Sequence, residues 1–422
     1  MSKLFSLFYE TKGVCTDTRS ILPDSLFIAL KGNNFNGNLF AKNAIQNGAK
    51  FAIVDQEEFA DNIKIFFVPN TLKFLQDLAK YHRAKFNIPV IGITGSNGKT
   101  STKELLYSVL SKKFKTIATR GNLNNHLGVP FTLLRIKEED EIAIIEMGAN
   151  QPGDIQELCN IASPTHGIIT NIGKAHLEGF GNLEGVVKTK SALYQSVKKQ
   201  NGVLFFNEDD SLLKSLIDHT TENISYGKEN ADITGDLIEL NPYICMCWKS
   251  STYTSVNLNT NMVGNYNFYN FLAAICIGNY LGIKEMDISD AVATYKPENK
   301  RSQVLEAKRN KLIVDCYNAN PTSMLLALES FHVFDHNKKL AILGDMLELG
   351  QDSEQEHQKI IDYCKENKIE FITVGPIFKN LNKETGHQDV SSLSSELSTI
   401  HSSAILLKGS RGIELEKVID HL

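Results

Sequence analysis

The sequence predicts an α/β protein of three domains, and three observations lead to this fold class. The chain has 422 residues, which exceeds the size of an ordinary single domain. Short apolar runs alternate with helix-length amphipathic segments, a rhythm typical of parallel sheets. A polar stretch at 295–303, broken by Pro297, indicates a linker. We therefore expect domains at residues 1–83, 84–297 and 298–422.

The first domain is predicted to be a small α/β unit. Its apolar runs are SLFIAL at 25–30, KFAIVD at 50–55 and KIFFVP at 64–69. Runs of this length, with helix-like patterns between them, indicate short buried strands.

The central domain is predicted to contain a parallel sheet. PVIGIT at 89–94 is typical of a buried strand, and the segment from Lys99 to Phe114 has its apolar residues on one helical face. EIAIIEMG at 141–148 and HGIIT at 166–170 indicate two more buried strands, each ending in polar residues. Ligands of such sheets gather at the carboxyl ends of the strands.

The third domain repeats this rhythm and is predicted to be Rossmann-like. Strands are expected at KLIVD, KLAILGD, EFITVG and AILLKGS, and helices from Pro321, Ser353 and Gly412. The Ser-rich segment 391–403 also favours a short surface helix, because Leu393, Leu397 and Ile400 are spaced for one helical face.

Composition narrows the class of partner. The net charge is -5 and the chain has no long basic run, so we expect no nucleic-acid partner. The longest apolar stretch, near 271–283, carries Asn279 and Tyr280 and is too short to span a bilayer, so we expect no membrane insertion. The start MSKLFSLFYETKG lacks a signal-peptide layout. We expect a monomeric protein in the cytoplasm.

The cysteines are predicted to be structural. Their number is seven and their spacing does not repeat, which argues against a disulfide framework. Cys245 and Cys247 alternate with apolar residues as in a strand, and we expect buried free thiols with no metal.

The stretch IGITGSNGKT at 91–100 is predicted to bind phosphate. Ile93 stands where the usual Walker pattern has its first glycine, but a strand enters the loop and an amphipathic helix leaves it. Backbone N–H groups and the helix N-terminus then attract phosphate, Lys99 adds a full charge, and the Thr100 hydroxyl can reach a magnesium ion. A plain glycine-rich turn is the alternative. The predicted nucleotide segment is Thr94, Gly95, Ser96, Asn97, Gly98, Lys99, Thr100 and Ser101. The central domain thus resembles a P-loop ATPase.

Two further strand ends carry candidate metal ligands. Glu146 ends one strand in EMGAN, and His176 follows another in TNIGKAHLEGFG. Either residue alone is more often structural, but beside a phosphate loop the two could hold magnesium. Lys188 and Lys190 in KTKSALY have the simpler interpretation of surface lysines on a helix.

Eight motifs, in this order, resemble the Mur ligase family over nearly the whole chain. They are CTDTRSILPDSLFIALKG, TGSNGKT, GNLNNHLGVP, EMGAN, NIGKAHLEGFG, DCYNANPTSM, LGDMLELG and LLKGSRG. The resemblance is strongest to the members that join D-alanyl-D-alanine to UDP-N-acetylmuramoyl-tripeptide, with ATP and Mg²⁺, through an acyl phosphate. It implies a role in cytoplasmic peptidoglycan precursor synthesis, and so in cell wall biogenesis, cell shape and cell division.

The resemblance also implies roles in catalysis and in nucleotide binding. Lys99 would bridge the outer phosphates, Thr100 and Glu146 would hold one magnesium ion, and His176 would take part in a second site with a carbamylated Lys190. The nucleotide would further contact Asn267, Asn270 and the linker residue Arg301. The family usually has His at Tyr266 and Gly at Lys300.

Substrate-binding roles follow from the same resemblance. Thr18 and Arg19 would bind the uridine end, although Asn36-Gly37-Asn38 stands where Asp-Gly-His is frequent. The remaining substrate residues would be Asn124, Asn125, Asp315, Asn318 and Asn320, the last three facing the incoming amine and the phosphates.

Other functions remain open from the residues alone. A sister amide ligase, such as a folate polyglutamate synthetase, would share the fold. A nucleotide switch would need an Asn-Lys-x-Asp segment, which NIGK at 171–174 and NKLIVD at 310–315 do not provide. A small-molecule kinase or a non-catalytic binding module are further alternatives. The sequence does not specify whether the third residue of the tripeptide is lysine or diaminopimelate.

Overall fold

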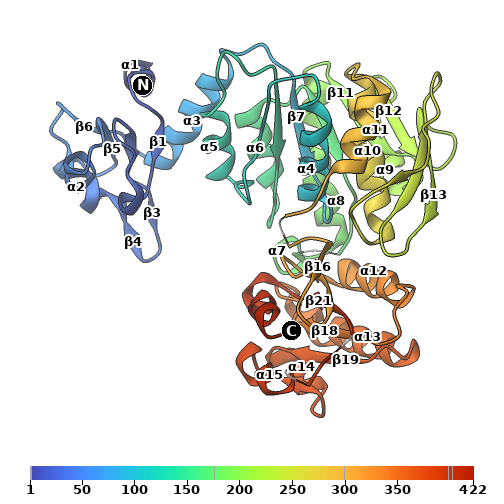
Figure 1. The fold of residues 1–422 in the computed structure, drawn as a ribbon. Helices are drawn as coiled ribbons and strands as arrows, with labels where there is room; N and C mark the ends of the chain where they lie inside the picture. The colour runs from blue at the N-terminus through green and yellow to red at the C-terminus, as the bar shows by residue number, and fades with distance from the viewer. Residues whose placement is uncertain (1, 175, 299, 398, 402) are drawn as a thin grey trace.

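The protein folds as three α/β units, seen here in a computed structural model that describes residues 2–174, 176–298, 300–397, 399–401 and 403–422. The central unit stands between the other two, with the N-terminal unit to one side and the C-terminal unit below it (Figure 1). The predicted three-unit α/β class is confirmed, and the domain boundaries stay predictions.

The N-terminal unit is built on a four-stranded parallel sheet in the order β1-β2-β5-β6. All three predicted apolar runs contain a strand of this sheet, and β3 and β4 form a separate hairpin. The elements are α1 (Ser2–Tyr9), β1 (Val14–Cys15), η1 (Thr18–Ser20), β2 (Leu26–Ile28), β3 (Lys31–Gly32), β4 (Phe35–Asn36), η2 (Gly37–Phe40), α2 (Ala41–Gln46), β5 (Phe51–Val54), η3 (Glu57–Phe59), β6 (Ile65–Phe67) and α3 (Thr71–Arg83).

Helix α3 fastens the N-terminal unit to the central one. Asn70 caps its start by accepting from the amide of Lys73. The Gln76 amide then donates to Glu157 at 2.7 Å, and the Arg83 guanidinium donates to the Ala162 carbonyl at 3.2 Å. Phe74 packs in the same core as the central helices, so one apolar core is continuous across this junction.

The central unit has a nine-stranded sheet in the order β15-β14-β13-β12-β11-β10-β7-β9-β8. The strands from β8 to β13 are parallel, and β14 and β15 extend the sheet in antiparallel fashion. The strands are β7 (Val90–Thr94), β8 (Thr116–Ala118), β9 (Ile142–Glu146), β10 (His166–Ile169), β11 (Val203–Asn207), β12 (Glu222–Gly227), β13 (Ile233–Glu239), β14 (Cys245–Lys249) and β15 (Leu258–Asn259). The helices are α4 (Lys99–Leu110), α5 (Gly128–Leu133), α6 (Asp154–Ala162), α7 (Leu177–Phe180), α8 (Leu183–Lys199), α9 (Ser211–Ser215), η4 (Asn265–Asn267), α10 (Phe268–Tyr280) and α11 (Glu285–Thr294).

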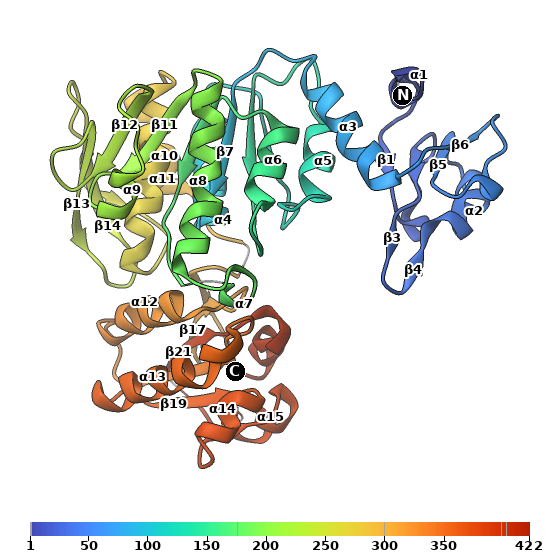
Figure 2. The ribbon, with the colours of Figure 1, turned by 180° about the vertical axis from the view of Figure 1, so that it is seen from behind.

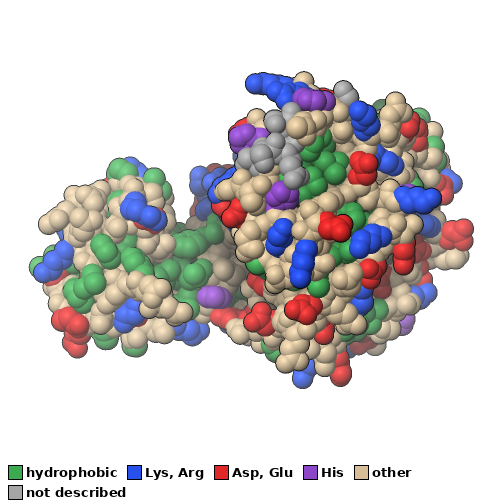
Figure 3. Space-filling model, turned by 90° about the horizontal axis from the view of Figure 1, so that it is seen from below, with side chains coloured by type: hydrophobic (Ala, Val, Ile, Leu, Met, Phe, Trp, Pro, Cys, Tyr) green, Lys and Arg blue, Asp and Glu red, His purple; other side chains and the backbone are tan. Residues whose placement is uncertain are grey.

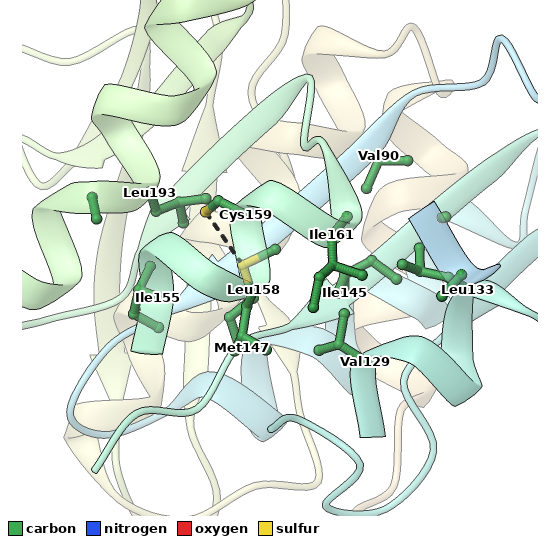
Figure 4. Packing of buried hydrophobic residues seen from close by; sticks show 14 of the residues in the cluster. Val90, Val129, Leu133, Ile145, Met147, Ile155, Leu158, Cys159, Ile161 and Leu193 are labelled. Atoms are coloured by element: carbon green, nitrogen blue, oxygen red, sulfur yellow. Dashed lines mark hydrogen bonds between the residues drawn. The ribbon is translucent and has the colours of Figure 1, made fainter. Parts of the chain in front are cut away.

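The central sheet is covered by an apolar core on each of its two faces. Val90 belongs to the core shown in Figure 4, whereas Ile91 and Ile93 belong to the core on the opposite face. In the first core Met147 and Cys159 lie in contact, with 3.8 Å between their sulfur atoms. Because both faces are buried, the open region next to the strands is their carboxyl edge, where the predicted polar residues follow.

The C-terminal unit has a six-stranded sheet in the order β16-β17-β21-β18-β19-β20. The edge strand β16 is antiparallel to β17 and the other pairs are parallel. The elements are β16 (Gln303–Glu306), β17 (Lys311–Asp315), α12 (Pro321–His332), β18 (Lys339–Gly344), η5 (Gly350–Asp352), α13 (Ser353–Glu366), β19 (Phe371–Val374), α14 (Pro376–Leu381), β20 (Gly386–His387), α15 (Val390–Leu397), β21 (Ala404–Lys408), η6 (Arg411–Ile413) and η7 (Leu415–His421).

The predicted final α-helix from Gly412 is wrong, because this segment forms the 3₁₀ turns η6 and η7. Glu414 between them adopts φ 58°, which interrupts a right-handed helix. Leu415 and Val418 are both buried, and a spacing of three residues suits a 3₁₀ helix. The Ser-rich segment does form helix α15, with Leu393 and Leu397 buried, while Ser398 and Ser402 lie outside the described residues.

The surface carries charged and hydrophobic side chains in different distributions. Acidic and basic side chains are interspersed over the face seen from below, and hydrophobic side chains gather on the N-terminal lobe (Figure 3). In the described parts of the chain, no helix is long and apolar enough to cross a membrane.

All seven cysteines are free thiols. The prediction of burial is wrong for Cys247, which is half-buried because it lies on the face of β14 opposite Met246 and Trp248.

Candidate active site

The phosphate loop runs from the end of β7 to the start of α4, and two of its glycines are required by close contacts. Gly95 has φ 152° and Gly98 has φ 79°. A Cβ atom would lie 1.9 Å from the Thr170 hydroxyl oxygen at Gly95, and 2.6 Å from Asn270 Oδ1 at Gly98. Any larger residue at either position would therefore displace the loop.

The loop is anchored to the segment after β10. The Ser96 amide donates to the Asn171 carbonyl at 2.9 Å, and the Asn97 amide donates to Asn171 Oδ1 at 2.9 Å. The N–H groups at the start of α4 can donate to phosphate oxygens, because the first amides of a helix have no hydrogen-bond partner within it. Thr94 ends β7 and Ser101 lies in the first turn of α4, so the eight predicted residues are contiguous around the loop.

Two lysines converge on one carbonyl oxygen of this loop. Lys99 Nζ donates to Gly95 O at 2.7 Å, and Lys190 Nζ, from α8, donates to the same atom at 3.0 Å. Burial lowers the pKa of Lys99 to about 8, an effect that Glu146 opposes and Arg301 reinforces. Burial and the neighbouring Lys99 lower the pKa of Lys190 well below its ordinary value. Lys190 is thus a buried amine of low basicity, whereas Lys188 is exposed on the same helix.

Glu146 provides an uncommitted carboxylate oxygen beside the loop. Its Oε1 accepts from the Thr100 hydroxyl at 3.2 Å and from the Asn124 amide at 2.8 Å. Its Oε2 is buried and has no hydrogen-bond partner among the described residues. An unpaired buried carboxylate oxygen is costly. A hard cation bound by Glu146 and Thr100 would remove that cost, so this pair fits Mg²⁺.

His176 and Lys190 both lie beside the Phe180 ring. The imidazole meets this ring edge-on, 6.4 Å between centroids, and Lys190 Nζ lies 6.0 Å from the same ring. His176 Nδ1 pairs with the carboxylate of Glu348 from the C-terminal unit, and this bond lowers the pKa of Glu348. Within the described ranges no three His, Cys, Asp or Glu side chains cluster as a metal cage. A cation here would need phosphate, water or a modified Lys190 as further ligands, which is usual for Mg²⁺.

The linker arginine lies over an aromatic ring. The Arg301 guanidinium is 3.9 Å from the centroid of the Tyr317 ring, and its buried Nε has no hydrogen-bond partner in the part of the chain that is described. The charge of Arg301 acts on Lys99, so the two cations lie at one site.

Asn267 and Asn270 are buried behind the loop. Asn270 Nδ2 donates to Asn267 Oδ1 at 2.8 Å, and Asn270 Oδ1 accepts from the Thr102 hydroxyl at 3.1 Å. Asn267 Nδ2 donates to the Ser302 hydroxyl at 2.9 Å, which ties the linker to the loop. Their contact with adenine stays a prediction.

The C-terminal unit reaches the loop through Asn320. Its Nδ2 donates to Asn97 Oδ1 at 2.7 Å, while its Oδ1 caps α12 by accepting from the Ser323 amide. At the end of the neighbouring strand, Asp315 accepts from Lys408 at 2.8 Å. Asn318 is exposed, and its carbonyl also accepts from Lys408.

Three predicted residues, Thr18, Arg19 and Asn125, do not contact the described part of this cluster through their side chains. Two lie in the N-terminal unit, and the third bonds to the nearby backbone. Arg19 is exposed in η1 of the N-terminal unit, next to Thr18, and its guanidinium lowers the pKa of Asp17 to about 2. Asn125 Oδ1 accepts from the Gly128 amide at 2.9 Å and so holds the backbone at the start of α5. Its neighbour Asn124, by contrast, contacts Glu146 directly.

The structure adds three residues to the site that received no individual role from the sequence: Tyr317, Glu348 and Lys408. Each lies in a motif that was singled out, but its partner is distant along the chain. Lys408 is 2 % exposed and could have been suspected as a lone lysine at the end of an apolar strand. No local pattern could have indicated the partners of Glu348 and Tyr317.

Comparison with known proteins covers almost all of the chain. Residues 10–83 match the model for the Mur ligase family, catalytic domain; residues 93–278 match the Mur ligase middle domain; and residues 300–410 match the Mur ligase, glutamate ligase domain.

Full-length relatives agree with these matches. The UDP-N-acetylmuramoyl-tripeptide--D-alanyl-D-alanine ligase of Bacillus subtilis is 32% identical over 97% of this chain and 93% of its own length. A crystal structure of MurF from Acinetobacter baumannii superposes with a TM-score of 0.90 at 30% identity, covering 99% of this chain and 97% of that one. MurF ligase from Thermotoga maritima in complex with ADP superposes at 0.86 with 27% identity, covering 97% of each chain. The chain belongs to the Mur ligase family.

Proposed function

We propose that this protein is an ATP-dependent ligase that joins D-alanyl-D-alanine to UDP-N-acetylmuramoyl-tripeptide. The reaction would release ADP and phosphate during peptidoglycan precursor synthesis in the cytoplasm, and the enzyme would act as a monomer. One contact carries the proposal: the hydrogen bond from Asn320 to Asn97, 2.7 Å long, holds the start of helix α12 of the C-terminal unit against the phosphate loop. A ligase needs this proximity, because a carboxyl group activated at the nucleotide must meet an amine held on another domain.

The chemistry requires an activated carboxylate, because joining a carboxylate to an amine is unfavourable in water. ATP transfers its γ-phosphoryl group to the terminal carboxylate of the tripeptide, which gives an acyl phosphate and ADP. The amine of the dipeptide attacks the acyl carbon, and the tetrahedral intermediate collapses with loss of phosphate and a proton. Negative charge spreads over the transferred group, so the cations of the site carry much of the catalysis.

Lys99 is the principal cation of this site. In the structure its ammonium group donates to two carbonyls of its own loop, those of Gly95 and Ser96. Bound phosphate would replace these carbonyls as the acceptor and would favour the charged lysine. Arg301, held over Tyr317, would add a second charge to the same phosphates.

Magnesium would be held at two places. Thr100 and Glu146 would bind one ion, and His176 with a carbamylated Lys190 would bind the other. The bound ions supply neutralisation of the phosphate oxygens. Asn124 fixes the Glu146 carboxylate, because it donates to Oε1 and leaves Oε2 without a partner among the described residues, so that Oε2 would be available to the ion.

Carbamylation of Lys190 suits its surroundings. A neutral amine attacks CO₂, a new N–C bond forms, and one proton leaves, so the product carries a negative charge. The reaction would replace the uncharged amine beside Gly95 O by an anion, which would attract Lys99. It would also provide the oxygen ligands that Mg²⁺ prefers.

The remaining substrate contacts are assigned by domain. Thr18 and Arg19 would bind the uridine end on the N-terminal unit, with Asn124 and Asn125 between this unit and the nucleotide. Asp315, Asn318 and Asn320 would face the dipeptide. An ammonium group could take the place of Lys408 against Asp315 before it loses its proton.

The test is phosphate release from ATP and Mg²⁺ with purified protein. UDP-N-acetylmuramoyl-tripeptide and D-alanyl-D-alanine are added separately and then together, and the product is identified by mass spectrometry. We expect release with both substrates, matched by pentapeptide product. Turnover only with another acyl chain or amine would keep the chemistry and overturn the assigned substrates. Comparing lysine and diaminopimelate tripeptides would identify the third residue.

A further inference from the structure

Glu348 of the C-terminal unit reaches across the domain boundary to His176. Its carboxylate lies in ion-pair contact with Nδ1 of the imidazole, and this buried nitrogen has no hydrogen-bond partner elsewhere among the described residues. Helix α7, which follows His176, lies against the C-terminal unit in both ribbon views (Figures 1 and 2). A ligand proposed for the central site thus has its imidazole held by a different domain.

The loop that carries Glu348 is held by hydrogen bonds from three consecutive backbone amides. The Asp345 amide donates to the Val374 carbonyl at 2.9 Å. The Met346 amide donates to His357 Nε2 at 2.9 Å, and this imidazole is fully buried. The Leu347 amide donates to the Ser410 hydroxyl at 3.0 Å. A loop with three consecutive amides bonded holds the next side chain in a defined place.

The backbone on both sides of the pair takes an unusual conformation. Glu348 has φ 65° and His176 has φ 52°, a region that non-glycine residues rarely adopt. Next to the pair, Gly350 packs on α7, since a Cβ there would lie 3.6 Å from Glu178. Strained residues that meet each other persist where the surrounding structure holds them, and they are frequent at functional sites.

The hydrogen-bond chemistry defines what this contact does to the imidazole. An ionised carboxylate only accepts hydrogen bonds, so Nδ1 carries the proton. The lone pair of a neutral imidazole is then on Nε2, the nitrogen that remains for a metal ion. Carboxylates commonly orient metal-binding histidines in this way.

We propose that Glu348 is a positioning residue that orients His176 for the second magnesium site, so that this site is complete only when the C-terminal domain is docked. The inference rests on the proposed function, because that function requires a metal at His176. It makes domain docking a condition for assembling the site.

A second contact across the same boundary provides a matched control. Lys174, two residues before His176, pairs with Glu356 at 3.3 Å. Glu356 keeps Lys359 as a partner at 2.9 Å when Lys174 is removed. Lys174→Ala therefore removes a half-exposed ion pair that contributes little to the docking of the domains, and it leaves the imidazole and its carboxylate in place.

The experiment measures Mn²⁺ binding, by electron paramagnetic resonance, to protein with ADP in bicarbonate buffer. Wild type is compared with Glu348→Ala, Glu348→Gln and Lys174→Ala, and circular dichroism checks that each variant folds. We expect Glu348→Ala to lower the affinity for one of the bound manganese ions by about 10- to 100-fold. Glu348→Gln should lose less, because its amide oxygen still accepts from Nδ1. Lys174→Ala should stay within about 2-fold of wild type.

A metal-free measurement gives an independent readout. In ¹⁵N NMR spectra, assigned by comparison with His176→Gln, we expect His176 to carry its proton on Nδ1 in wild type and to become a tautomer mixture in Glu348→Ala. Unchanged manganese binding in Glu348→Ala, tighter binding in that variant, or equal weakening in Lys174→Ala would each overturn the inference. Failure of the proposed function would appear instead as wild type that releases no phosphate with both substrates.

Discussion

Lys99 and Lys190 donate to the same carbonyl oxygen, that of Gly95, at 2.7 Å and 3.0 Å. Two ammonium groups this close repel each other, and the burial of both amines strengthens the repulsion. The arrangement is therefore stable only if at least one amine is neutral or if anions approach the loop. Burial and the charge of Lys99 lower the pKa of Lys190 well below its ordinary value, so Lys190 is the member of the pair that gives up its proton more readily.

The first prediction concerns the modification of Lys190. A neutral buried amine reacts with CO₂, so we expect one carbamate signal in ¹³C NMR spectra after addition of ¹³C-bicarbonate. The signal should be absent from Lys190→Ala and present in Lys188→Ala, whose side chain is exposed on the same helix. Lys190→Ala should lower turnover by about 100- to 1,000-fold, the usual effect of losing one group that stabilises the transition state. A carbamate signal that persists in Lys190→Ala would refute the assignment.

The second prediction is a pH dependence of nucleotide binding. Burial lowers the pKa of Lys99 to about 8 in the free protein, and bound phosphates raise it again. Above pH 8 the complex therefore holds more protons than the free protein, so affinity falls as pH rises, by up to about 10-fold per pH unit. Calorimetry at pH 8.5 in two buffers of different ionisation enthalpy should detect proton uptake.

Lys99→Arg is the control for this pH effect. A guanidinium remains charged throughout the range, so its nucleotide affinity should not follow the same slope. Equal slopes for wild type and Lys99→Arg would assign the pH effect to another group.

Much of the phosphate site could be predicted because its signals are local. A buried strand, a glycine loop and an amphipathic helix follow one another within the segment 89–110, and β7 and α4 form where expected. The polar residues at the ends of β9 and β10 follow from the rule for parallel sheets. The wrong prediction of an α-helix from Gly412 has a local cause too. Apolar residues that recur every three positions fit a 3₁₀ helix as well as an α-helix.

The contacts between domains could not be predicted in this way. Glu348 and His176 are far apart in sequence, as are Asn320 and Asn97, and hydrophobic periodicity carries no information about such pairs. The choice between Lys190 and Lys188 also depended on the family resemblance. The physical distinction is burial, which the sequence of an amphipathic helix with lysines on two faces leaves open.

The third prediction is a trade of stability against metal binding at Glu146. The buried Oε2 has no hydrogen-bond partner among the residues described, so the metal-free protein carries a desolvated carboxylate oxygen whose cost the nearby charge of Lys99 offsets only in part. Glu146→Gln keeps an acceptor for Thr100 and Asn124 and replaces the charge by a neutral amide. We expect the free energy of unfolding without metal to rise by about 1 kcal/mol, while magnesium-dependent turnover is lost. Urea unfolding with chelator measures the first effect.

Glu146→Ala separates the charge from the hydrogen bonds. It removes the acceptor of Thr100 and Asn124 and leaves a cavity, so it should destabilise the metal-free protein. If Glu146→Gln destabilised the protein as much as Glu146→Ala, the carboxylate would be satisfied in solution and the metal site would need another explanation.

The fourth prediction concerns Tyr317, which supports Arg301 through its ring. The guanidinium lies 3.9 Å from the ring centroid, and a desolvated contact of this kind contributes about 1–2 kcal/mol. Tyr317→Phe keeps the ring and should bind ATP as wild type does. Tyr317→Leu removes the ring face and should raise the Kd for ATP by about 5- to 30-fold, because Arg301 would no longer be held toward the phosphates. In Arg301→Ala the further change Tyr317→Leu should have little effect, since the two residues act through one contact. Additive losses in the double variant would mean that Tyr317 contacts the nucleotide independently of Arg301.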